Sequence, residues 1–131
     1  MGFLKNRIYS FKNAFRGVFV FFTNYGGTHA KIHLAATIIV VGMGIYFDIN
    51  STQWVALSLA IGLVFIAEMI NSAIEQLVDL VHPGWNEKAG AIKDMAAGAV
   101  LIASFVALAI GILVFGTQLI ILVAYFFGFH G

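Results

Sequence analysis

The stretch "WVALSLAIGLVFIAEMINSAIEQLVDLV", residues Trp54 to Val81, decides the fold class of this chain. A membrane-spanning α-helix needs roughly 20 predominantly apolar residues, and this stretch is longer than that. Residues 54–67 carry no charge, but Glu68, Glu75 and Asp79 follow and make up half of the six acids in the chain. The stretch therefore predicts a transmembrane helix at about residues 53–81 whose last turns carry acids that hydrocarbon alone would not tolerate.

Composition places the rest of the chain in the same class. The 131 residues are 61% hydrophobic and 10% charged, whereas soluble domains are about 25% charged. Two further apolar runs predict transmembrane helices at about 30–48 and 93–118, and Gly116 or Gly128 is a candidate end for the second. The chain has no cysteine, which excludes disulfides and cysteine nucleophiles. We expect one all-α integral membrane domain over residues 1–131.

The N-terminal residues predict a helix that lies on the membrane surface. Basic and apolar side chains alternate at near-helical spacing over about 3–24, which is typical of an amphipathic interfacial helix. With three crossings, all seven basic residues of the chain fall on one side of the membrane. The positive-inside rule then places the N-terminus and the loop 82–94 in the cytoplasm.

The acids of the second span lie on one face of the predicted helix. At about 100° per residue, Glu68, Glu75 and Asp79 fall within about 40° of one another, and Asn71 and Ser72 flank them. An ionised carboxylate in a membrane usually faces a bundle interior or a cavity and marks function. Asp79 could be a solvated residue at the helix end, and Asn71 could be an interhelical hydrogen-bonding group. Glu68, about three turns deeper than Asp79, is the hardest to explain as purely structural.

The start of the third span supplies the complementary chemistry. Lys93 and Asp94 are followed by small residues, which let helices approach closely, so we expect this pair beside Glu75 and Asp79. In phosphoryl transfer from a nucleotide, carboxylates hold Mg²⁺, a lysine neutralises phosphate oxygens, and another carboxylate orients or deprotonates the attacking hydroxyl. The chain has no Walker-type or GxGxxG motif, so a nucleotide site here must be of another design.

Residues 67–104 resemble the signature of the prokaryotic diacylglycerol kinase family. That signature is E-x-x-N-[ST]-A-I-E-x-x-V-D followed by K-D-x-A-[AS]-[AG]-A-V, and the chain has "EMINSAIEQLVD" from Glu68 and "KDMAAGAV" from Lys93. The resemblance implies a small homotrimeric lipid kinase of the bacterial inner membrane. It implies MgATP as phosphate donor and a lipid alcohol, either diacylglycerol or undecaprenol, as acceptor. Membrane lipids are the expected surroundings, and no nucleic-acid partner is expected.

Carried over residue by residue, the resemblance implies a role for each matching position. Glu68 would be the general base for the lipid hydroxyl, with Ala97 as a second lipid-contacting residue. Glu75 would be the Mg²⁺ ligand close to ATP. The remaining positions would bind or organise the nucleotide: Asn71, Asp79, Lys93 and Asp94, together with the loop residues Gly84, Trp85 and Asn86.

One position departs from the family pattern. Members usually have an acid six residues before the histidine of "KIH", and it is expected to share the metal with Glu75, but this chain has Gly27 there. His29 or Asn24 could replace the acid if the loop shifts. Two alternatives therefore stay open: a non-catalytic relative of the family, and a small proton-coupled transporter that uses Glu68 alone.

Overall fold

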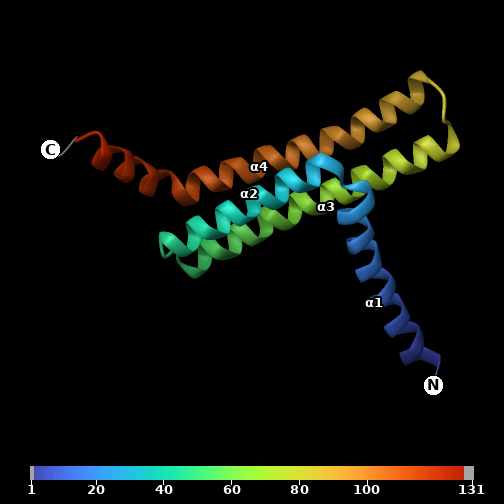
Figure 1. Ribbon diagram of the computed structural model, residues 1–131, viewed down its shortest axis with the longest axis horizontal. Coiled ribbons are helices and arrows are strands. Elements are labelled where there is room, and N and C mark those ends of the chain that lie inside the picture. Colours follow the sequence, from blue (N-terminus) through green and yellow to red (C-terminus); the bar gives the residue numbers. More distant parts are fainter. Residues whose placement is uncertain (1, 129–131) are drawn as a thin grey trace.

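The computed structural model describes residues 2–128, with side chains from residue 5 onward. The chain forms α1 (Gly2–Val20), a π-helical turn η1 (Phe21–Tyr25), α2 (Gly27–Tyr46), α3 (Ser51–Val81) and α4 (Glu87–Phe126). Helices α2, α3 and α4 lie alongside one another, and α1 projects away from them at a steep angle (Figure 1). Within the described residues, three helices are long and apolar enough to cross a membrane: α2, α3 and α4. The expected all-α membrane architecture is confirmed.

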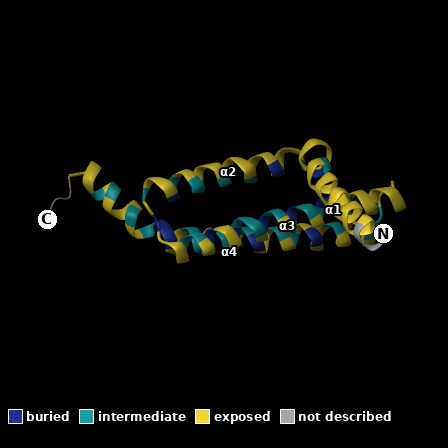
Figure 2. Cartoon of the chain, turned by 90° about the horizontal axis from the view of Figure 1, so that it is seen from below, coloured by how far each residue is buried: buried dark blue, intermediate teal, exposed yellow. Residues whose placement is uncertain are grey.

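Helix α1 has no covering from the rest of its own chain. Every side chain from Lys5 to Phe19 is exposed, including the aromatic rings of Phe11 and Phe15. Figure 2 shows this helix in the colour of exposed residues along nearly its whole length. The placement of α1 on a membrane surface stays a prediction, and such a surface would bury these rings.

The three long helices are joined most tightly near the turn between α2 and α3. Ile49, Leu57, Val114 and Phe115 form a buried cluster there. Partly buried side chains of α2, α3 and α4 pack around it: Val40, Met43, Phe47, Trp54 and Ile110. From this cluster α3 and α4 continue side by side toward the loop that joins them (Figure 1).

Side-chain caps set where α3 and α4 begin. Asn50 and Gln53 form a capping box, in which each side chain accepts a hydrogen bond from the backbone N–H of the other at 3.0–3.1 Å. Asn86 accepts hydrogen bonds from the backbone N–H of Lys88 and Ala89. Such caps satisfy donors that the first helical turn leaves unpaired.

Helix α4 exceeds the expected crossing of 93–118 at both ends. It passes through Gly116 without a break, and Gly128 adopts a left-handed conformation (φ 70°) just beyond its last residue. Its 40 residues make a helix about 60 Å long, twice the roughly 30 Å thickness of a bilayer core. Because α4 begins at Glu87, Lys93 lies in its second turn rather than at its start.

Gly44 provides a test of the packing at the α2–α3 end. A Cβ atom at Gly44 would lie 2.8 Å from Cη2 of Trp54 and 3.1 Å from Cδ1 of Ile49, whereas one at Gly42 would meet nothing within 4 Å. We expect Gly44→Ala to lower the free energy of unfolding by about 1–3 kcal/mol relative to Gly42→Ala, as overpacking does. Denaturant titration in detergent micelles measures both variants, and equal stabilities would contradict this packing.

Candidate functional site

The deepest acid of the chain, Glu68, lies on the buried face of α3. That face is formed by residues three or four apart, namely Leu57, Ala60, Val64, Glu68 and Ser72. Glu68 is only 5% exposed. The spacing that places these aliphatic residues on the buried face of α3 therefore places the Glu68 carboxylate in the protein interior as well.

Among the described residues, Glu68 pairs with His33 of α2. His33 Nε2 lies 3.0 Å from Glu68 Oε1, which is hydrogen-bonding distance. A buried carboxylate without a partner would be strongly unfavourable, so this contact satisfies a polar group that the protein interior would otherwise leave unpaired. Sequence reasoning missed the pairing, because the two residues are 35 positions apart. The only signal was the position of His33 in the "KIH" segment.

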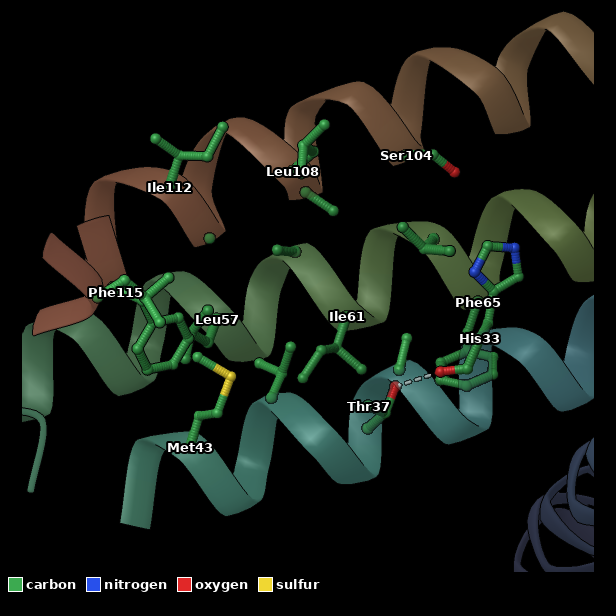
Figure 3. A pocket seen from close by; sticks show the side chains of 17 residues that line it. His33, Thr37, Met43, Leu57, Ile61, Phe65, Ser104, Leu108, Ile112 and Phe115 are labelled. Atoms are coloured by element: carbon green, nitrogen blue, oxygen red, sulfur yellow. Dashed lines mark hydrogen bonds between the residues drawn. The ribbon is translucent and has the colours of Figure 1, made fainter. Parts of the chain in front are cut away.

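An apolar cavity of about 420 Å³ opens beside this pair, between α2, α3 and α4. His33 lies at one end of it, and Met43 and Phe115 lie at the other (Figure 3). Its walls are mostly aliphatic, and the polar side chains Thr37 and Ser104 lie toward the His33 end. Thr37 donates its hydroxyl hydrogen to the backbone carbonyl of His33 at 2.8 Å. We call this cavity the α2–α4 groove.

Farther along α3, an amide and a carboxylate form a second polar group. Asn71 Nδ2 donates to Glu75 Oε1 at 3.1 Å, and both residues are half-buried. The other amide atom, Asn71 Oδ1, is buried and has no hydrogen-bond partner among the described residues. Carboxylate and amide oxygens are the ligands that hard cations prefer.

The oxygens of Glu75 and Asn71 are of the chemical type that would bind Mg²⁺. Mg²⁺ usually binds through one or two carboxylates and takes its other ligands from phosphates and water. In the part of the chain that the structure describes, no group of three or more His, Cys, Asp or Glu side chains could hold a metal alone. Glu75 and the unpaired oxygen of Asn71 would supply the protein's share.

Six of the residues predicted to bind the nucleotide gather where α3 and α4 meet their connecting loop. Lys93 Nζ donates to Asp79 Oδ1 at 2.9 Å, and both side chains are exposed. They share a depression of about 440 Å³ with Asp94 and with the loop residues Gly84, Trp85 and Asn86. Trp85 is 91% exposed. The expected proximity of Lys93 and Asp94 to Asp79 is confirmed.

Four predicted site residues lie outside this depression, namely Glu68, Asn71, Glu75 and Ala97. Glu75 is about one helical turn deeper than Asp79 on α3 and bonds to Asn71 rather than to Lys93. Ala97 is exposed on α4, and it is absent from the linings of the cavities found among the described residues, although its neighbour Ala96 is buried. The single chain therefore gives Ala97 no contact with the groove beside Glu68.

Gly27 has a conformational reason to be glycine. It is the first residue of α2, separated from the π-helical turn by Gly26, and its φ is 52°. Side chains other than those of Asn and Asp rarely adopt this left-handed conformation. Asn24 and His29, the possible substitutes for the missing acid, are both exposed.

Together, the fold and these side chains define a small helical membrane protein with a buried carboxylate beside an apolar groove and a charged depression at one helix end. Residues 12–115 match the family described as prokaryotic diacylglycerol kinase. The chain belongs to this family.

Curated relatives agree with that placement. The chain is 35% identical over 111 residues to the undecaprenol kinase of Bacillus subtilis (strain 168), which covers 84% of this chain and 89% of that protein. It is 39% identical over 72 residues to the diacylglycerol kinase of Escherichia coli (strain K12), covering 55% of this chain and 59% of the relative. It is 34% identical over 107 residues to the diacylglycerol kinase of Synechocystis sp., covering 81% and 60%.

The left-handed backbone at Gly27 generates a stability prediction. We expect Gly27→Glu to lower the free energy of unfolding by about 1–2 kcal/mol, the usual penalty for a side chain in this conformation. Gly27→Asn is the control, since asparagine tolerates the conformation, and its loss should be clearly smaller. Thermal unfolding followed by circular dichroism compares the two, and a Gly27→Glu protein as stable as the parent would show that no strain exists there.

Proposed function

We propose that this protein transfers the γ-phosphoryl group of ATP, bound with Mg²⁺, to the hydroxyl of a membrane lipid alcohol at the cytoplasmic face of the bacterial inner membrane. Its family makes the chain a lipid kinase. The observation that carries the finer proposal is the position of Glu68, buried with His33 at the polar end of the α2–α4 groove.

The groove suits the hydrocarbon part of the acceptor. Methylene or isoprenoid groups of the lipid would pack against its aliphatic walls, and no polar group would be left without a hydrogen-bond partner there. A lipid lying in it with its alcohol toward His33 would place the hydroxyl next to the buried carboxylate. A water-soluble alcohol would gain nothing from such walls.

The depression at the α3–α4 loop suits the nucleotide. Lys93 offers a positive charge to phosphate oxygens, and Asp79 holds its ammonium group in place. The exposed indole of Trp85 offers a face on which an adenine ring could stack. Glu68 and Asp79 are eleven residues apart along α3, or about 16 Å at 1.5 Å per residue. An extended nucleotide bound at the loop would point its phosphates along this interval, past Glu75 and Asn71.

The reaction uses few groups of the protein. The lipid hydroxyl gives up its proton toward Glu68 as its oxygen forms a bond to the γ-phosphorus. The bond from that phosphorus to the β,γ-bridging oxygen breaks, and ADP leaves with the electron pair. Mg²⁺ bound with the nucleotide would neutralise phosphate charge, and Glu75 and Asn71 are the residues that would hold it. The buried position of Glu68 keeps water from competing for the phosphoryl group.

The proposal also concerns the identity of the acceptor and the oligomeric state. Relatives named for either acceptor align with most of this chain, an undecaprenol kinase over 84% of it and a diacylglycerol kinase over 81%, so both alcohols are tested as acceptors. A homotrimer would cover apolar side chains of α4 that the single chain leaves exposed outside the groove, such as Leu101 and Leu113. Nothing among the described residues favours the transporter or the non-catalytic alternative.

The role of Glu68 is tested by Glu68→Gln, which keeps the shape of the side chain but removes its charge. We expect phosphoryl transfer to fall by at least about 100-fold, within the range of lost general-base catalysis. Asp48→Asn is the matched control, because Asp48 is exposed in the turn between α2 and α3, far along α3 from Glu68. Labelled phosphate transferred from ATP to undecaprenol and to diacylglycerol in bilayers measures both. Equal labelling by Glu68→Gln and the parent protein would overturn the assignment.

The groove is tested by Ala107→Phe, which fills the cavity from α4. We expect the KM for the lipid alcohol to rise by about 10-fold while the KM for ATP stays within about two-fold. A 10-fold rise in this KM corresponds to about 1.4 kcal/mol of lost binding free energy. Ala109→Phe places the same ring on the exposed face of α4 and should change neither constant. If both variants bind the lipid like the parent, the acceptor lies elsewhere.

A further inference from the structure

We propose that His33 is the group that meets the lipid hydroxyl, and that His33 and Glu68 work as one proton-accepting pair. This inference rests on the proposed function and assigns a role to a residue outside the matched signature. It changes the route of the proton, which would reach the buried carboxylate only by way of the imidazole.

The two side chains differ in what they face. The side chain of His33 is 22% exposed and that of Glu68 is 6% exposed. His33 belongs to the lining of the α2–α4 groove, whereas Glu68 is not among the residues that the structure places on its walls. The imidazole extends from α2 toward α3 at the groove's end (Figure 3). A hydroxyl that enters along the groove therefore reaches the imidazole before it reaches the carboxylate.

The hydrogen bond between the pair suits proton transfer. When Nε2 carries its hydrogen toward Glu68 Oε1, Nδ1 keeps a lone pair and can accept a proton. Among the described residues, no hydrogen-bond partner of His33 Nδ1 is found. A carboxylate that holds an imidazole in this way fixes its tautomer and stabilises the imidazolium that forms, as in the Ser-His-Asp arrangement.

The lipid O–H bond breaks and its proton moves to Nδ1 of His33, while the lipid oxygen bonds to the γ-phosphorus and ADP departs with the electrons of the broken P–O bond. The imidazolium and the Glu68 carboxylate then form a neutral ion pair, which hydrocarbon tolerates better than an isolated charge. The proton passes to water after the products leave, which restores the starting pair.

A supporting role for His33 would predict different kinetics. If His33 only holds Glu68 in place, His33→Gln should keep most activity, because a glutamine amide can also donate a hydrogen bond to Glu68. An amide cannot accept a proton under these conditions. We therefore expect His33→Gln to lower kcat by about 100-fold while the KM values for lipid and ATP stay within about three-fold. A kcat near that of the parent would overturn the proposal.

The control variant is Ile39→Ala on the same helix, whose side chain is exposed outside the groove, and it should keep the parent's kcat. Circular dichroism and gel filtration of each variant show that it is folded. Equal losses of kcat in His33→Gln and Ile39→Ala would also contradict the proposal. Such a result would mean that changing any side chain of α2 lowers kcat, so that the effect is not specific to His33.

A second readout does not depend on kinase activity. An apolar carbodiimide reacts with protonated carboxyl groups inside membranes, and mass spectrometry of the digested protein locates the adduct. Because His33 contacts Glu68 Oε1 and lies between Glu68 and the groove, we expect His33→Ala to raise the modification rate of Glu68 several-fold, with Ile39→Ala unchanged. An unchanged rate in His33→Ala would show that the pair does not form. If this rate rises although the parent protein phosphorylates no lipid, the proposed function fails and the pairing stands.

Discussion

The burial of the Glu68 carboxylate inside a membrane-crossing helix is the constraint on which the rest of the site depends. An ionised group at this depth persists only with a partner, and His33 of α2 supplies it at 3.0 Å. That requirement fixes α2 beside α3 at this level, so the same contact positions one wall of the α2–α4 groove. A carboxylate that would otherwise destabilise the fold thus joins two helices and creates the polar end of an apolar cavity.

The remaining polar groups follow from the depth at which α3 places them. Glu68 is buried, Asn71 and Glu75 are half-buried one to two turns farther on, and Asp79 reaches the exposed end. The cap at Asn86 lets α4 begin early enough for Lys93 to stand opposite Asp79. One helix pair therefore presents a gradient from hydrocarbon to water, which matches the difference in polarity between a lipid alcohol and a nucleotide.

Local patterns in the sequence predicted most of the fold and part of the site. Apolar runs of bilayer length predicted the three long helices, and the period of α3 put Glu68, Glu75 and Asp79 on one side. The contact of Lys93 with Asp79 was also foreseen, because the small residues after Lys93 let α4 approach α3 closely. The His33–Glu68 pair was not, since it depends on how α2 packs against α3. The early start of α4 was missed because the capping role of Asn86 was not recognised. The left-handed backbone of Gly27 was missed because neither it nor the π-helical turn before Gly26 has a clear sequence signal.

The most direct test of the account is to locate the lipid alcohol itself. A lipid alcohol with a diazirine on the carbons nearest its hydroxyl, irradiated with the protein in bilayers, would mark its neighbours for mass spectrometry. The account predicts adducts on residues at the polar end of the α2–α4 groove, around His33, Thr37 and Ser104, that excess unlabelled alcohol suppresses. Suppressible adducts confined to the opposite face of α3 and α4, around Ile66, Ile70 and Ile102, would contradict it.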